Sequence, residues 1–358
     1  MAMMISRGDR GEHPDTCRPQ YIRPFSISFS RCDAPRRPFD VPPPFPVTQT
    51  CPEPSCSCSP TPPMPEGLEI DYAQPLNGTM AAYTQQLLIC TGQSDWTSRI
   101  EDDGQGTGWG ALSRGCKKLL GRGGKYADPY NNVLITNSSF PAASAAASSP
   151  CTASAFLFPS FKFFPSISAT IEGPQDSLSK FIRAFLLPLK LHDMHSALPE
   201  SVRAELTRSP ELASEFPDAI DIKQSPTILI CGHAGRDMRC GVMGPVLQAE
   251  FQRVLRERGF SSTTHPDGST VDGPNHANVG LISHIGGHKY AGNVIIYIPP
   301  GLTGPDGALS PLAGKGIWYG RIEPKHVEGV VDETILKGRV IADHFRGGID
   351  ADGKILRL

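Results

Sequence analysis

Short apolar runs alternate with helical patterns in the last third of the chain. Four runs of mostly apolar residues lie at 226–230, 278–283, 293–298 and 317–319. Between the first two, residues 242–258 place apolar side chains on one helical face and polar side chains opposite. A second helix is expected to begin at Pro324, and Gly338 is placed to end it. Since short apolar runs are typical of strands buried on both faces, this order predicts a thioredoxin-like α/β domain.

A similar pattern occurs earlier in the chain and indicates an internal duplication. The run Leu-Leu-Ile-Cys that ends at Cys90 is followed by a glycine and then by Asp95. The run Ile-Leu-Ile-Cys that ends at Cys231 is followed in the same way by a glycine and Asp237. Two further apolar runs follow in each copy. We therefore predict two thioredoxin-like domains, at residues 67–200 and 201–358.

Proline and small residues mark two segments that are expected to lack a core of their own. Residues 1–66 carry several proline pairs and are expected to form a disordered, largely extended tail. The first part of this tail is rich in arginine and serine, which partly fits a mitochondrial transit peptide, although its acidic residues do not. We therefore expect a mitochondrial location, with the cytoplasm as the alternative. The Ala- and Ser-rich stretch 141–155 is expected to be a surface loop.

The composition excludes two classes of function. The formal net charge of -2 gives no bulk electrostatic attraction to nucleic acid. No run approaches the roughly 20 apolar residues that a membrane span needs. The ten cysteines are too dilute for a disulfide-stapled domain and indicate metal or redox chemistry in a reducing compartment.

Two cysteines and two histidines in the second copy are candidate metal ligands. Cys231 is expected at the carboxyl end of a buried strand, where α/β folds commonly place their sites. Cys240 follows at the start of the next helix, where the helix dipole stabilises a thiolate. His284 and His288 flank a Gly-Gly pair in a loop after the following strand, and we expect this tight loop to turn both imidazoles inward.

Two thiolates and two imidazoles suit either a zinc ion or a [2Fe-2S] cluster. Arg236 and Arg239 lie in the loop between the cysteines and can offset the negative charge of a thiolate-ligated group.

Other interpretations of the cysteines and histidines stay open. Buried cysteines often act only as small hydrophobic residues. His233 forms a Cys-x-His pair with Cys231, which makes it either an alternative ligand or a residue that supports the site. The tail cysteines are a further candidate for thiol–disulfide exchange or for a metal site, although the prolines between them exclude regular structure. These cysteines are Cys51, Cys56 and Cys58.

The ligand motifs resemble those of the sucrase/ferredoxin-like family. The stretch from Cys231 to Gly241 and the run His-Ile-Gly-Gly-His-Lys-Tyr-Ala-Gly-Asn at 284–293 carry the resemblance. The Trp-Tyr-Gly-Arg motif at 318–321 is also similar. The likeness covers most of residues 51–346, and within the family it is strongest to a fungal branch linked to mitochondrial inheritance.

The resemblance implies a [2Fe-2S] cluster in a thioredoxin-like ferredoxin domain. The ligands that it implies are Cys231, Cys240, His284 and His288. The expected function is electron transfer with an unidentified redox partner protein, in mitochondrial redox or thiol homeostasis. The protein would then be an electron carrier rather than a turnover enzyme, without catalytic residues. The alternatives are a thiol–disulfide oxidoreductase and a non-redox protein with a structural zinc site.

The first copy is expected to bind no cluster. Aligned on its own Cys90, it has Arg99, Ser138 and Ala142 at the other three ligand positions. We therefore predict a degenerate first domain that serves as a structural or docking partner of the second.

Overall fold

The computed structural model describes residues 42–358, apart from 56, 148–149, 172–175 and 263–270. The predicted targeting segment and Cys56 lie outside the described residues. The helices are α1 Gly108–Leu120, α2 Ser144–Ala147, α3 Ser177–Phe181, α4 Glu200–Leu206, α5 Met238–Glu257 and α6 Val327–Val330. The strands are β1 Val47–Thr48, β2 Gln85–Cys90, β3 Val133–Ser138, β4 Thr152–Phe158, β5 Lys162–Ser168, β6 Ile220–Asp221, β7 Thr227–Cys231, β8 Asn278–Ile282, β9 Val294–Ile298, β10 Lys315–Tyr319, β11 Val340–Ile341, β12 Phe345–Ile349 and β13 Ile355–Leu356.

The predicted elements of the last third of the chain are confirmed as β7, α5, β8, β9 and β10. Helix α5 begins four residues earlier than expected, at Met238, because the side chain of Asp237 accepts a hydrogen bond from the backbone N–H of Arg239 and so caps the helix. The predicted helix from Pro324 is present as three consecutive helical segments. The middle segment is α6, and the last one ends at Leu336.

Eleven strands form one mixed sheet, in the order β13-β12-β10-β9-β7-β8-β3-β2-β4-β5-β6. We call β2–β6 the first half and β7–β13 the second half. In the first half β2 lies between parallel β3 and antiparallel β4, and in the second half β7 lies between parallel β8 and antiparallel β9. The halves join where β3 pairs antiparallel with β8, through Ser138 and Ile282. The chain is therefore mixed α/β with the same strand arrangement in both halves, and the thioredoxin-like assignment of each half stays a prediction.

Strand pairing also links residues on both sides of the boundary predicted at residue 200. Strand β6 pairs with β5 through Asp221 and Lys162, and residues Pro43–Leu358 form one compact unit. The position of a domain boundary within this unit stays a prediction.

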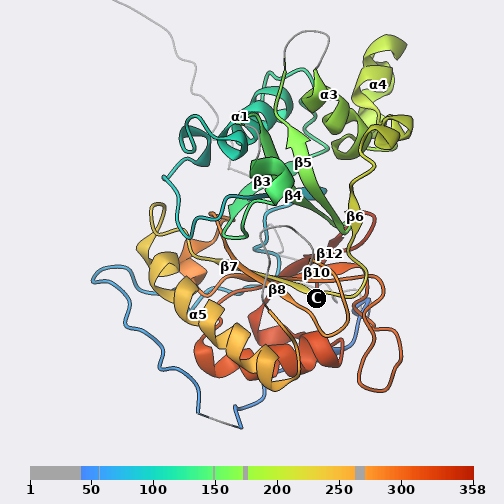
Figure 1. Cartoon of the computed structure of the whole chain (residues 1–358). Helices are drawn as coiled ribbons and strands as arrows, with labels where there is room; N and C mark the ends of the chain where they lie inside the picture. The colour runs from blue at the N-terminus through green and yellow to red at the C-terminus, as the bar shows by residue number, and fades with distance from the viewer. Residues whose placement is uncertain (1–41, 56, 148–149, 172–175, 263–270) are drawn as a thin grey trace, which may run out of the picture. The chain divides into compact units, whose positions relative to one another are not determined.

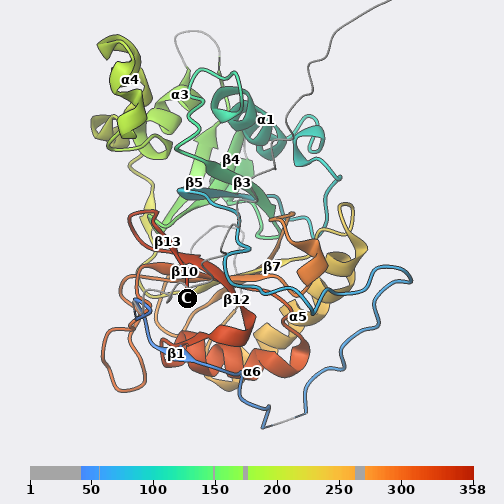
Figure 2. The same ribbon diagram turned by 180° about the vertical axis from the view of Figure 1, so that it is seen from behind.

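Each central strand is buried on both faces, which explains the continuous apolar runs. On β7, Ile228 and Ile230 belong to a core that includes Leu247 and Phe251 of α5. Leu229 belongs to a second core, in which aromatic side chains of both halves meet. Figures 1 and 2 show α1 and α3 beside the strands of the first half, and α5 and α6 beside those of the second.

A buried polar network joins the two halves within this second core. The hydroxyl of Tyr297 donates to Oε1 of Gln86 at 2.7 Å and lies 2.8 Å from the hydroxyl of Tyr83. Nε1 of Trp318 donates to the Tyr83 hydroxyl at 2.9 Å. Phe158 stacks on Tyr297 with ring centroids 3.9 Å apart. Because these buried polar groups are partnered across the halves, they favour a single orientation of one half on the other.

Residues 42–80, which we call the N-terminal strap, run along the second half before the chain enters β2 (Figures 1 and 2). Strand β1 pairs with β11, and the buried Phe45 packs edge-on against Phe345 with ring centroids 5.8 Å apart. The prediction of a disordered, extended tail is not confirmed for residues 43–66, of which the structure describes all but residue 56 and fixes them by contacts to the second half. Their own aromatic and hydroxyl side chains supply the contacts that hold them.

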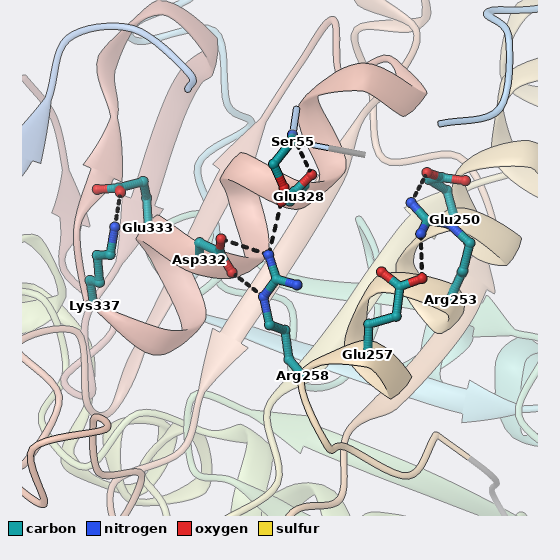
Figure 3. Close-up of polar contacts among 9 residues, drawn as sticks. All are labelled: Ser55, Glu250, Arg253, Glu257, Arg258, Glu328, Asp332, Glu333 and Lys337. Atoms are coloured by element: carbon teal, nitrogen blue, oxygen red, sulfur yellow. Dashed lines mark hydrogen bonds and ion pairs between the residues drawn. The ribbon is translucent and has the colours of Figure 1, made fainter. Parts of the chain in front are cut away.

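Serine hydroxyls of the strap bind carboxylates on the helices of the second half. Ser55 donates to Glu328 from both its backbone N–H and its hydroxyl, and the hydroxyl of Ser59 donates to Glu250 at 3.0 Å. Glu328 also forms an ion pair with Arg258 at 3.0 Å, and Arg258 holds Asp332 through two further bonds (Figure 3). The strap is therefore fixed to α5 at Glu250 and to α6 at Glu328, and only the second of these carboxylates also pairs with Arg258, the residue after α5.

The Ala- and Ser-rich stretch 141–155 is not the surface loop that we predicted. It includes α2 and the first residues of β4. Ala143, Ala146 and Ala153 are at most 3% exposed. Small side chains carry little hydrophobic pattern, yet they allow a helix to pack closely on a sheet, so this prediction was wrong.

The strand register corrects the alignment of the two copies. Cys90 pairs with Ser138 in the first half, whereas Cys231 pairs with Ile282 in the second. Ser138 therefore corresponds to Ile282 and not, as predicted, to His284. The true counterpart of that histidine lies two residues further on and is a phenylalanine.

The counterpart of Cys240 also differs from the prediction. Cys240 is the third residue of α5, and the third residue of α1 is Gly110. The predicted counterpart, Arg99, lies instead in the longer loop 91–107 that precedes α1. Since neither corrected position has a metal-binding side chain, the absence of a second ligand set in the first half does not depend on the alignment.

None of the helices in the described part of the chain has the length and apolar character that a membrane crossing requires.

Candidate functional site

The two candidate cysteines lie at the junction of β7 and α5. Cys231 is the last residue of β7, and Cys240 lies in the first turn of α5. Their side chains are 2% and 1% exposed. Helix α5 approaches the end of β7 closely at Gly244, where a Cβ would lie 2.6 Å from the Cα of Gly232 and 2.9 Å from the carbonyl oxygen of Cys231. A larger residue at position 244 would push the helix, and with it Cys240, away from Cys231.

The thiols of Cys231 and Cys240 form a hydrogen bond with each other, and this bond lowers the pKa of Cys231. A hydrogen bond and the charge of His284 lower it further, against the opposing effect of burial. The same thiol–thiol bond raises the pKa of Cys240. The pair therefore favours one thiolate, on Cys231, in contact with an imidazole.

The two candidate histidines lie in the loop that follows β8. Their ring centroids are 5.4 Å apart, and the two glycines between them adopt positive φ angles of 83° and 74°. Nε2 of His288 lies 3.9 Å from Oδ2 of Asp237, the capping residue of α5. Burial lowers the pKa of His288, although Asp237 opposes this effect. Nδ1 of His288 is shielded from solvent and has no hydrogen-bond partner among the described residues.

His233 does not point its nitrogens at the cysteines. Nδ1 accepts a hydrogen bond from the backbone N–H of His284 at 3.0 Å. Nε2 donates to the carbonyl oxygens of Trp96 and Thr97 at 3.0 and 2.9 Å. These partners fix the tautomer and occupy both nitrogens, so the interpretation of His233 as an alternative ligand is wrong. His233 instead connects the first half to the histidine loop.

The first half covers the loop between the two cysteines. The backbone N–H of Gly235 donates to both carboxylate oxygens of Asp95, at 3.1 and 3.2 Å. Nη1 of Arg236 donates to the hydroxyl of Ser98 at 3.2 Å. The segment after β2 is similar in sequence to the cysteine loop, and it packs directly against that loop. This contact is what we expect of a first half that acts as a docking partner.

The two arginines named from the sequence differ in their relation to the cysteines. Arg236 binds Ser98 of the first half. Arg239 pairs with Asp237 at 2.9 Å, and its charge also opposes the rise in the pKa of Cys240. A further cation near the site is the buried Arg346 of β12, which donates to Asn293, and the carbonyl oxygen of Asn293 accepts from the backbone N–H of Cys231. Sequence reasoning missed both residues, although Asn293 ends the histidine motif that we identified.

The four candidate ligands lie as two pairs. Cys231 and Cys240 contact each other, His284 contacts Cys231, and His288 lies beside His284. In the described part of the chain, no three His, Cys, Asp or Glu side chains converge tightly enough to hold a single metal ion. This spacing disfavours a four-ligand zinc site, because tetrahedral zinc needs its ligands around one point.

Cys51, one of the tail cysteines that the structure describes, is not an activated thiol. Burial, with the charges of Glu53 and Glu333, raises the pKa of Cys51 to about 12. Its thiol donates to the carbonyl oxygen of His326 at 3.5 Å. Cys51 and Cys58 both have free thiols. A raised pKa keeps a thiol protonated at neutral pH and so makes it a poor nucleophile.

Comparisons with known proteins agree with these site motifs. A family model described as sucrase/ferredoxin-like matches residues 76–347, a range that includes all four candidate ligands. A protein of Meyerozyma guilliermondii named altered inheritance of mitochondria protein 32 is 30% identical over 309 residues, which cover 84% of this chain and 95% of that protein. A protein of the same name from Debaryomyces hansenii is 31% identical over 310 residues, covering 84% of this chain and 96% of its own length.

A shorter match, to a protein of the same name from Clavispora lusitaniae, is 35% identical over 185 residues, which cover 49% of this chain and 54% of that protein. No solved structure matches the chain significantly. The family match extends over most of both halves, from the strap to β12. The chain therefore belongs to the sucrase/ferredoxin-like family.

Proposed function

We propose that this protein is an electron carrier that holds a [2Fe-2S] cluster through Cys231, Cys240, His284 and His288. The observation that carries the proposal is the arrangement of these side chains as a buried thiol pair beside a histidine pair. A two-iron cluster has two metal centres, and each takes its own pair of protein ligands. A single metal ion would need all four side chains around one point, and two adjacent pairs do not provide this arrangement.

The pKa shifts of two of the four residues, Cys231 and His288, also support the proposal. Thiolates and neutral imidazoles are the forms that bind metals. The lowered pKa of Cys231 favours its thiolate, and the lowered pKa of His288 favours its neutral imidazole. The unpartnered Nδ1 of His288 is the nitrogen that this residue has available for a metal.

The ligands differ in solvent exposure, and this difference indicates the side of the site through which electrons would enter or leave. A [2Fe-2S] cluster exchanges one electron at a time with a partner protein. Both cysteines are buried, whereas the side chain of His288 is 43% exposed. We infer that the unidentified redox partner docks at the histidine loop. The names of the relatives support a role linked to mitochondria, and we infer redox or thiol homeostasis from the proposed cluster alone.

The test is the visible and EPR spectrum of the full chain, purified without oxygen, with iron, sulfide and zinc quantified. We expect about two irons and two sulfides per chain, as the [2Fe-2S] formula requires. The cluster should be lost in Cys231→Ala and retained with an altered spectrum in His288→Cys. The matched control is Cys90→Ala, which removes a buried cysteine at the equivalent strand end of the first half. Stoichiometric zinc without sulfide would refute the proposal.

The thiol–disulfide alternative has a separate readout. Thiol activity that disappears on replacing Cys58, with the spectrum unchanged, would favour it. The raised pKa of Cys51 argues against its use as a nucleophile.

A further inference from the structure

Arg346 is a buried cation beside the candidate site. Its side chain is 1% exposed. Its donors bind the hydroxyl and carbonyl oxygens of Thr79 at 3.0 and 2.8 Å, the carbonyl oxygen of Gly286 at 3.2 Å, and Oδ1 of Asn293 at 2.6 Å. All of these acceptors are neutral, and none of the carboxylates that the structure describes forms an ion pair with Arg346. A buried charge is costly unless something of opposite charge offsets it.

The groups around Arg346 show where its counter-charge lies. The guanidinium carbon is 5.6 Å from the ring centroid of Tyr290 and 5.7 Å from that of Trp318, so aromatic faces supply part of the compensation. Asn293, whose Oδ1 accepts from Arg346 at 2.6 Å, also accepts from the backbone N–H of Cys231 through its carbonyl oxygen at 3.0 Å. One residue therefore links the guanidinium to the end of β7 that carries the first cysteine of the pair, where a thiolate would be the nearby negative group.

Arg346 also holds the loop that carries the two histidines. It binds the carbonyl oxygen of Gly286 directly, and Asn293 binds that of Gly287 at 2.9 Å. A Cβ at Gly287 would lie 2.4 Å from Nη2 of Arg346, so the loop backbone rests on the guanidinium. The carbonyls of both glycines between His284 and His288 are therefore fixed by one buried Arg–Asn pair.

We propose that Arg346 is a positioning and charge-compensating residue of this site: it fixes the loop that carries His284 and His288, and it stabilises the more negative, reduced form of the bound cluster. The second part rests on the proposed function. A positive charge close to a redox centre favours the state with the additional electron, and low polarity around the charge strengthens the effect. Asn293 assists by binding both the guanidinium and the loop.

The positioning role is tested on the full chain without a cluster, by hydrogen exchange of the backbone amides at 285–288. We expect Arg346→Lys, which keeps the charge but lacks the planar fork, to accelerate exchange there at least tenfold. Arg346→Met should do the same. The matched control is Arg258→Met, which removes the arginine directly after α5, 18 residues beyond Cys240 and about 27 Å away along the helix axis. Unchanged loop exchange in folded Arg346→Lys and Arg346→Met would overturn the positioning role.

The charge role is tested by the reduction potential of the loaded protein. Arg346→Met should shift the ratio of oxidised to reduced protein at a fixed potential at least tenfold toward the oxidised form, about 59 mV for one electron. Arg346→Lys should stay within threefold of the natural protein. Asn293→Asp keeps the side-chain shape and gives Arg346 a carboxylate partner, so it should lower the potential even if Arg346→Met does not fold.

Potentials of Arg346→Met and Asn293→Asp within threefold of the natural protein would overturn the charge role. A chain that binds no cluster would overturn the proposed function and with it the charge role. The exchange experiment would still decide the positioning role, so the two failures are distinguishable.

Discussion

Replacing His233 should uncouple the first half from the histidine loop, because the His233 ring connects the two. Nδ1 of His233 accepts from the backbone N–H of His284, and Nε2 donates to the carbonyl oxygens of Trp96 and Thr97. The ring is 1% exposed, and it lies edge-on to Trp96 with centroids 5.8 Å apart. The substitution His233→Ala removes all of these contacts at once.

The contacts set the size of the expected loss. A shielded N–H left without an acceptor costs about 1–3 kcal/mol, and an ordinary hydrogen bond contributes about 1 kcal/mol. The N–H of His284 and the two carbonyls of the first half together give a loss of about 3 kcal/mol for His233→Ala. Since a domain is stable by roughly 5–15 kcal/mol, urea unfolding of the chain without a cluster measures this loss readily.

Two polar substitutions divide the loss between the two sides of the ring. Asparagine places an oxygen near the position of Nδ1, so His233→Asn should keep the bond to His284 and lose the bonds to Trp96 and Thr97. Glutamine reaches the position of Nε2, so His233→Gln should do the reverse. Hydrogen exchange of the His284 amide should therefore stay slow in His233→Asn and accelerate about fivefold to tenfold in His233→Gln, which corresponds to about 1–1.4 kcal/mol.

Equal exchange at the His284 amide in the two variants would refute this reasoning. A loss of less than about 1 kcal/mol in folded His233→Ala would also refute it, because three buried polar groups cannot lose their partner at so small a cost. The corresponding control is Cys90→Ala, which changes a buried residue of the first half outside this network.

Two further predictions concern groups away from the site. Burial, with the charge of His344, lowers the pKa of His326 to about 4, so unfolded chains take up a proton near pH 6.5 that the folded chain accepts only near pH 4. The contribution of His326 to the free energy of unfolding should therefore be fully present above pH 6.5. The free energy of unfolding should fall by about 1–2 kcal/mol, after allowance for solvent screening, as the pH drops to 4. In urea titrations, His326→Gln should remove this loss. Separately, Cys51, whose pKa is raised to about 12, should react with iodoacetamide at pH 8 at least tenfold more slowly than the exposed Cys151, as peptide mass spectrometry can measure.

Each of these predictions has a clear contrary result. The same loss of stability between pH 6.5 and pH 4 in His326→Gln would assign the effect to other groups. Equal alkylation of Cys51 and Cys151 in the folded chain would show that the strap does not shield the Cys51 thiol.

The elements around the candidate site could be predicted from the sequence because their signals are local. The apolar runs that became β7, β8 and β9 are buried on both faces, so they contain few polar residues. The helical face of α5 was visible for the same reason. Its first turn was missed because the signal there is a capping aspartate, Asp237, rather than an apolar stripe.

Segments without an apolar pattern were predicted poorly. The stretch 141–155 is built from alanine and serine, which are buried only because a sheet lies beside them. The strap 42–80 is held by Phe45 and by serine hydroxyls that bind carboxylates more than 190 residues away. Neither kind of contact can be inferred from neighbours in the chain.

The sequence by itself determined the α/β class, the family, and the four candidate ligands, because short motifs and apolar runs express these directly. Only the tertiary structure decided that His233 faces away from the cysteines, that the histidine loop rests on Arg346, and that the first half covers the cysteine loop. These relations depend on strand register and on contacts between residues 60–140 positions apart. A buried charge or hydrogen bond acts through distance in space, and distance along the chain does not specify it.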